Sequence, residues 1–123
     1  MTEIHSYMEA LMLAEEDPIL LEPGQTLFEQ GEPGRDMYIV RTGFVLLRVG
    51  GSEVEQVARG GLLGEMALID PAPRSASAVA GENCSVVAIT EGAFHALVKQ
   101  VPGFALEVMR SMARRLRQSN ASA

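Results

Sequence analysis

The chain is poor in cysteine and in aromatic side chains. Its 123 residues include one cysteine, no tryptophan, four phenylalanines and two tyrosines. A single thiol excludes an internal disulfide and a cysteine-ligated metal cluster. With so few rings, aliphatic side chains must fill the core, and the 47% hydrophobic content is sufficient for that. We expect Cys84, which lies in an apolar run, to be a small buried residue rather than a reactive thiol.

Positive charge and long apolar runs are also scarce. Ten Lys and Arg face sixteen Asp and Glu, for a formal net charge of −6. Contact with duplex nucleic acid requires a basic face, so we expect no direct nucleic-acid partner for this chain, and we expect no anionic membrane surface either. No apolar run approaches the ~20 residues that span a bilayer, and the N-terminus lacks a signal-peptide pattern. The sequence therefore predicts a cytoplasmic protein.

The residue sets that carry out common catalysis are missing as well. The two histidines, His5 and His95, fall in separate expected helices, and no Ser-His-acid set, metal-ligand cluster or Walker-type phosphate loop is present. We therefore expect that the protein is not an enzyme and that it uses no metal or cofactor.

What is present is a sequence for one β-rich domain covering residues 1–123. Twelve glycines indicate many tight turns. Apolar residues at helical spacing predict an N-terminal helix within residues 1–17. From Ile19 to Ile89 about eight short strands alternate with turn residues, and glycines such as Gly24, Gly31 and Gly43 mark the turns. That spacing is typical of a barrel or a sandwich over residues 18–90.

Two helices are expected over residues 91–118. Thr90 is a candidate N-cap, and Pro102-Gly103 separates the first helix from a second one that runs from about Phe104 to Gln118. The second helix carries an apolar stripe that consists of Ala105, Met109, Met112 and Leu116, widened by Phe104 and Val108. We expect this stripe to pack on the barrel with a hinge at Pro102-Gly103; a lid over a ligand and a dimer seam remain alternatives.

The C-terminal end of that helix is rich in arginine. Four arginines crowd there, namely Arg110, Arg114, Arg115 and Arg117. Cations are favourable near a helix C-terminus, so we expect a solvated helix end rather than a binding patch. Residues 120–123 are expected to be a frayed tail.

The most informative stretch is GGLLGEMALIDPAPRSASAV, from Gly60 to Val79. Gly64 permits a positive φ or a close backbone approach, and the residues after it can form one helical turn whose free N–H groups favour an anion. Arg74 can return its planar fork of donors to the same anion, bidentately for a phosphate. Glu65 would be repelled there unless it accepts a hydrogen bond from a ligand hydroxyl.

These requirements describe a ligand with one phosphate-like charge and a nearby hydroxyl, such as a ribose cyclic phosphate. The alternative is that Glu65 and Arg74 form only a surface salt bridge, as many isolated charge pairs do. Several positions of this stretch match a known binding pattern together and at fixed spacing, which favours ligand binding over the salt bridge.

The same stretch resembles the phosphate-binding cassette of the cyclic nucleotide-binding domain family. That pattern reads approximately F-G-E-hydrophobic-A-L, a short loop, then R-[STA]-A. The matching residues are Gly64, Glu65, Met66, Ala67, Leu68, Arg74, Ser75 and Ala76. Leu63 stands where the family usually has phenylalanine, and the run from Leu20 to Val45 also resembles the family's N-terminal half.

The resemblance implies a fold and a set of ligand contacts. It implies a mainly β domain with flanking helices: a double-stranded β-helix (jelly-roll) barrel with one N-terminal and two C-terminal helices, and a cassette at residues 63–76. It implies that Glu65 binds the ribose 2′-hydroxyl and that Arg74 binds the cyclic phosphate, with backbone amides near Ala67 and the Ser75 hydroxyl as further donors. Gly64, Met66 and Ala76 complete the ligand-binding set.

The function implied is that of a cyclic nucleotide sensor, with cAMP favoured by Ser75 and cGMP as the alternative. Ligand occupancy would be transmitted through the C-terminal helices to a homodimer partner or an effector protein. Two alternatives remain: an interaction module that binds another ligand or none, and the sensor part of a transcription regulator whose DNA-binding domain is not in this chain.

Overall fold

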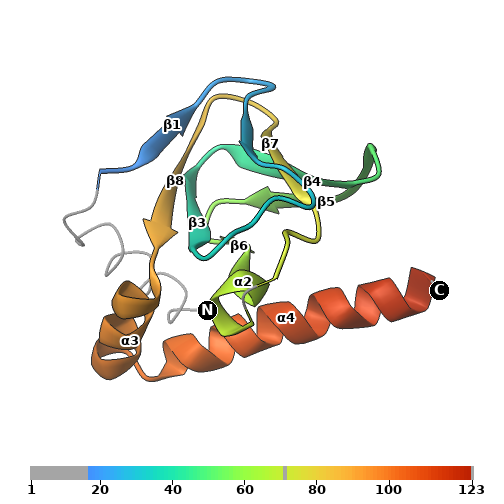
Figure 1. Cartoon of the computed structure of the whole chain (residues 1–123). Coiled ribbons are helices and arrows are strands. Elements are labelled where there is room, and N and C mark those ends of the chain that lie inside the picture. The colour runs from blue at the N-terminus through green and yellow to red at the C-terminus, as the bar shows by residue number, and fades with distance from the viewer. Residues whose placement is uncertain (1–16, 71, 123) are drawn as a thin grey trace.

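The fold is described by a computed structural model of the chain, which covers residues 17–70 and 72–122 (Figure 1). The expected N-terminal helix lies outside this range, apart from Asp17. The strands are β1 Ile19–Leu21, β2 Thr26–Phe28, β3 Met37–Thr42, β4 Phe44–Val49, β5 Ser52–Ala58, β6 Leu62–Leu63, β7 Ser77–Ala80 and β8 Cys84–Ile89. The helices are α2 Glu65–Ile69, α3 Glu91–Gln100 and α4 Gly103–Ser122.

The eight strands form two antiparallel sheets of four strands each. Their orders are β1-β8-β3-β6 and β2-β7-β4-β5. Helices α3 and α4 lie together below the strands in Figure 1, and the short α2 sits between β6 and α4. The cassette thus leaves the sheets at β6, forms α2 against α4, and returns to the sheets at β7.

Alternating side chains on the first sheet build two cores. Val40 of β3 and Val86 of β8 point into the cluster between the two sheets, where Phe28, Val45 and Val57 also lie. The opposite faces of β3 and β8 pack against the three helices, through residues that include Met37, Ile39, Val87, Ile89, Leu97, Phe104 and Val108. Because successive strand residues face opposite ways, one sheet can bury both faces. The helices are therefore packed directly on the sheet whose outer strand β6 leads into the cassette.

The expected architecture is confirmed at the level of a mainly β domain with flanking helices, whereas the two sheets do not close into a barrel. A sheet closes only when its outer strands also pair with each other. In the described residues β1, β6, β2 and β5 are outer strands that pair on one side only, and the first three have only two or three residues each. The result is two packed open sheets.

The two C-terminal helices begin and break where the sequence predicts. The Thr90 hydroxyl accepts a hydrogen bond from the Ala93 amide at 3.1 Å and so caps α3. The second helix continues further than expected, because the backbone remains helical through Ser122 and no frayed tail begins at Asn120.

The buried face of α4 differs from the expected stripe. Its buried residues are Phe104, Val108 and Ser111, whereas Met109 and Leu116 are 55% and 63% exposed. The Pro102-Gly103 break fixes where α4 starts and how it is rotated on the sheet, and this rotation turns Phe104 and Val108 inward. The expected stripe is therefore confirmed in part, because Phe104 and Val108 are buried and Met112 packs against the core, whereas Met109 and Leu116 face outward.

Candidate functional site

Gly64 begins the cassette with the backbone conformation that the sequence predicts. Its φ is +69°, in the left-handed region, and it is the N-cap of α2. Within the turn, the Ala67 amide donates to the Gly64 carbonyl at 3.2 Å. The Ala67 amide is thus used within the turn, and donation to a ligand by the amides near it remains a prediction.

The backbone around Arg74 is held by a short ladder to the loop between β2 and β3. The Gly31 amide donates to the Arg74 carbonyl, and the Arg74 amide donates to the Glu32 carbonyl, both at 2.8 Å. Pro33 and Pro73 form an isolated antiparallel bridge beside them. Arg74 therefore starts from a fixed position although it belongs to a loop.

The Arg74 side chain lies in a tight slot and is only 7% exposed. Its Cζ stands 4.3 Å from the ring centroid of Phe28 and 5.7 Å from that of Tyr38, a cation–π arrangement. A Cβ atom would lie 2.1 Å from Arg74 Nε if added at Gly34, and 2.4 Å from Nη1 if added at Gly64. Both glycines thus make room for the guanidinium.

The electrostatics of this slot favour binding of an anion. The Arg74 Nε is buried and has no hydrogen-bond partner among the described residues, and Nη1 lies 3.5 Å from the Gly64 carbonyl oxygen, which is a long contact. Burial raises the pKa of the Tyr38 phenol and the Arg74 charge opposes that rise, so the ring beside Arg74 is neutral at physiological pH. A buried cation with unused donors can bind a phosphate without first losing a protein partner.

Glu65, the second predicted charge, lies buried at the start of α2 and is 2% exposed. Its partner is Arg115 of α4, whose Nη1 donates a short hydrogen bond to Glu65 Oε1. The Ser111 hydroxyl is 3.4 Å from the same oxygen. The other carboxylate oxygen, Oε2, is buried and has no partner among the described residues. This arrangement replaces the alternative of a surface salt bridge between Glu65 and Arg74.

Arg115 uses all five of its N–H groups. Nε and Nη2 donate to the two carboxylate oxygens of Glu55 at 2.9 and 3.1 Å, and Nη2 also donates to the Leu62 carbonyl at 2.6 Å. Nη1 donates hydrogen bonds to Glu65 and, at 3.2 Å, to the Ser111 hydroxyl oxygen. Burial opposes the charged form of Arg115, but the hydrogen bonds and charges of the two glutamates outweigh it and raise the pKa of this residue. Arg115 therefore stays charged and joins α4 to β5, β6 and α2.

The other predicted site residues lie around these two charges with different exposure. Ala67 is buried and Ala76 is partly buried against the core between the sheets, so both serve packing. Met66 is 55% exposed and Ser75 is exposed. Their contribution to a ligand site remains a prediction.

Three residues of the site were not predicted from the sequence. Gly34 was not distinguished from other turn residues, Glu55 was not distinguished from Glu53 on the same strand, and Arg115 was assigned to a solvated helix end. The signal for Arg115 was weak, because four arginines share that helix end, and only the rotation of α4 separates Arg115 from the exposed Arg114. The prediction that Arg115 is solvated is wrong.

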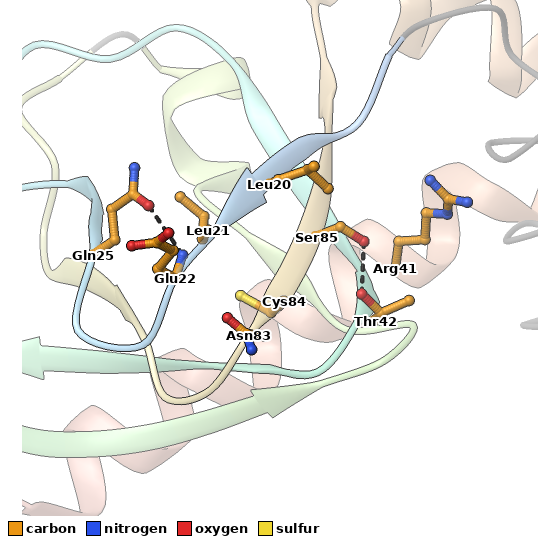
Figure 2. Close-up of a pocket in the computed structure, with 9 residues that line it drawn as sticks. All are labelled: Leu20, Leu21, Glu22, Gln25, Arg41, Thr42, Asn83, Cys84 and Ser85. Atoms are coloured by element: carbon orange, nitrogen blue, oxygen red, sulfur yellow. Dashed lines mark hydrogen bonds between the residues drawn. The ribbon is translucent and has the colours of Figure 1, made fainter.

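Two hollows on the surface contain neither Glu65 nor Arg74. One, of about 430 Å³, lies between β5, the β5–β6 turn and α4, and is lined by residues that include Glu55, Leu62 and Ser111. The other, of about 650 Å³, lies on β1, β3 and β8 (Figure 2). Figure 2 shows Thr42 and Ser85 joined by a hydrogen bond there, at 2.7 Å.

Two features are absent from the described part of the chain. No helix there is long and apolar enough to cross a membrane. No group of three or more metal-ligating side chains was found among residues 17–70 and 72–122.

Comparison with known proteins identifies the family. The family model described as "Cyclic nucleotide-binding domain" matches residues 18–101. The "Cyclic AMP receptor protein" of Thermus thermophilus is 37% identical over 106 residues, which cover 82% of this chain and 49% of the receptor. The chain thus spans about half the length of this curated relative.

Solved structures show the same similarity in three dimensions. The crystal structure of Thermus thermophilus catabolite activator protein superposes with a TM-score of 0.76 at 32% identity, covering 98% of this chain and 57% of that one. A structure titled "A cyclic-GMP-dependent signalling pathway regulates bacterial phytopathogenesis" has a TM-score of 0.75 at 25% identity, covering 94% and 93%.

Proposed function

Because the chain belongs to the cyclic nucleotide-binding domain family, we propose that it is a cytoplasmic, non-catalytic sensor that binds cAMP at the cassette. The observation that carries the proposal is a pair of buried, opposite charges on either side of Gly64, each with one buried polar atom that has no partner among the described residues. Arg74 Nε and Glu65 Oε2 are those atoms. A ribose cyclic phosphate supplies an acceptor for the first and a hydroxyl donor for the second.

In this proposal Arg74 binds the cyclic phosphate. Phe28, Tyr38, Gly34 and Gly64 hold the guanidinium in place before binding, which lowers the entropy that a flexible arginine would lose. The nearby Ser75 hydroxyl is exposed and adds a donor. We propose adenine as the base of the ligand because residue 75 is a serine, and cGMP is the competing ligand.

The ligand signal reaches α4 through Glu65. A ribose hydroxyl that donates to Oε2 redistributes the charge and shifts the position of a carboxylate that already binds Arg115 on its other oxygen. Ligand binding therefore favours one arrangement of α4 over others, as any ligand-driven shift requires. The output is carried by a partner of α4.

A second copy of the chain is the partner that α4 itself favours. Its outward residues Leu106, Met109 and Leu116 are each about half exposed or more. Such a large apolar surface on one helix is typical of an interaction site. We expect a concentration-dependent homodimer by analytical ultracentrifugation, and Met109→Glu should weaken it. A parent chain that stays monomeric at high micromolar concentration would assign this face to an effector protein.

Isothermal titration with cAMP, cGMP and AMP tests the ligand assignment. We expect cAMP to bind most tightly and AMP, with its open and more highly charged phosphate, to bind much more weakly. Arg74→Ala should cost about 2–4 kcal/mol of binding, which is the cost of removing one partner of a buried charge pair. Arg59→Ala, which removes an exposed arginine in the β5–β6 turn, is the matched control and should bind as the parent does.

The outcomes separate the competing functions. Tighter binding of cGMP would keep the sensor and change its ligand. No heat and no thermal stabilisation with any of the three nucleotides would favour an interaction module that uses another ligand or none. A role as the sensor part of a transcription regulator is compatible with cAMP binding, and it would be tested by examining whether the native reading frame continues into a basic domain.

A further inference from the structure

Arg115 divides its guanidinium unequally between two carboxylates. Its flat edge, made of Nε and Nη2, faces both oxygens of Glu55 at 2.9 and 3.1 Å. Only Nη1 reaches Glu65, and it binds Oε1 alone. Glu65 is the more deeply buried carboxylate, with 2% of its side chain exposed against 19% for Glu55. The bidentate pair is thus formed with the carboxylate that lies outside the cassette.

This division explains why Glu65 Oε2 is unused. A bidentate arginine–carboxylate pair is the strongest arrangement for these two groups, and it satisfies both carboxylate oxygens at once. A guanidinium free to rotate beside the buried Glu65 would present its edge to both oxygens, because an unpaired buried carboxylate oxygen is costly. Glu55 occupies that edge, so Arg115 can offer Glu65 only a single donor.

We propose that Glu55 is a positioning residue for recognition of the ribose hydroxyl. It holds the edge of Arg115 away from Glu65, so that Glu65 Oε2 stays available to accept the ligand's 2′-hydroxyl. Glu55 acts through Arg115 and does not itself touch the ligand. The inference rests on the proposed function, because it needs a cyclic nucleotide whose ribose hydroxyl meets Glu65.

The surroundings of Arg115 support a fixed orientation of the guanidinium. Its Nη2 also donates to the Leu62 carbonyl at 2.6 Å, and its Nη1 donates to Ser111 at 3.2 Å. Arg114, the neighbouring cation, is 53% exposed. Its Nη2 lies 3.8 Å from Glu55 Oε2, which is too long for a hydrogen bond. Glu55 therefore forms hydrogen bonds with Arg115 but not with Arg114.

The test compares cAMP with 2′-deoxy-cAMP, which lacks only the hydroxyl, on the parent chain and on Glu55→Gln. One hydrogen bond to a charged group corresponds to about tenfold or more in affinity, so the parent should prefer cAMP by that factor. In Glu55→Gln the preference should fall by about threefold or more, because Arg115 can then cover Oε2. Glu53→Gln, an exposed glutamate on the same strand, is the matched control and should keep the parent's preference.

Comparing two ligands separates positioning from a general structural role. If Glu55 only stabilised α4, its substitution would weaken both ligands equally and leave their ratio unchanged, and that result would overturn the inference. A parent that binds both ligands equally would overturn it too, through the hydroxyl assignment of Glu65. A parent that binds neither would overturn the proposed function first.

A second readout needs no ligand. In a crystal structure of Glu55→Gln without nucleotide, the Arg115 guanidinium should turn its edge to Glu65 and bind both carboxylate oxygens. An Arg115 that still binds Oε1 alone, with Oε2 unpartnered, would show that Glu55 does not keep that oxygen free.

Discussion

A glycine-to-alanine change beside Arg74 gives the most direct test of the phosphate site. Gly34 lies in the loop between β2 and β3, and a Cβ atom there would lie 2.1 Å from Arg74 Nε, 2.3 Å from Cζ and 2.7 Å from Nη2. Non-bonded heavy atoms rest at about 3.5 Å, so the guanidinium must move by roughly 1 Å or more. Gly34 is not among the glycines with positive φ, so alanine meets no backbone strain there.

The expected effect falls on binding rather than on folding. A displaced guanidinium loses at least one charge-assisted hydrogen bond to the ligand phosphate, worth about 1.5–3 kcal/mol. At about 1.4 kcal/mol per factor of ten, the Kd for cAMP should rise roughly 10- to 150-fold. The colliding atoms belong to the end of a flexible side chain, so the loss of folding stability should stay below the ~2 kcal/mol of the cation–π contact.

Titration calorimetry with cAMP measures this effect, and two variants control it. Gly92→Ala places a methyl group on the first turn of α3, where the nearest atom is 3.9 Å away, and should leave the Kd unchanged. In an Arg74→Ala background, Gly34→Ala should add less than about 0.5 kcal/mol, because the colliding side chain is gone. Parent-like binding by Gly34→Ala alone would refute the placement of the Arg74 guanidinium against this glycine.

Three further predictions concern the rest of the fold. Phe104→Ala should lower the free energy of unfolding in urea by about 3–5 kcal/mol, since this ring is 2% exposed, whereas Leu106→Ala, at a 48% exposed position of the same helix, should cost under about 1 kcal/mol. Burial raises the pKa of the Cys84 thiol, so at pH 8 this thiol should react with a disulfide reagent at least ~100-fold more slowly than in the urea-unfolded chain; comparable rates would contradict its burial. Because the pKa of Tyr38 is raised, this residue stabilises the fold at pH values below its unfolded pKa of 10.0, and this stabilisation is lost as the pH rises above that value. Tyr38→Phe should therefore show a smaller fall in melting temperature between pH 9 and pH 11 than the parent.

Features set by neighbouring residues were predictable from the sequence. The eight strands follow from alternating apolar residues between glycine turns, and α3 starts directly after Thr90 because the Thr90 hydroxyl can cap its first turn. Gly64 takes its positive φ as expected. Whether the two sheets close into a barrel was not predictable, because closure depends on how the outer strands of two sheets meet, which no local pattern encodes.

The candidate site divides in the same way. The sequence by itself predicted Glu65 and Arg74 as the charges of a ligand site, because a short loop fixes their spacing and their chemistry limits what they can bind. Only the tertiary structure joined Glu65 to Arg115 and Glu55, and only it brought Gly34 against Arg74. The physical reason is that a side chain's partner across elements depends on the rotation and docking of whole helices and strands, and four arginines on one helix look alike until α4 is packed on its sheet.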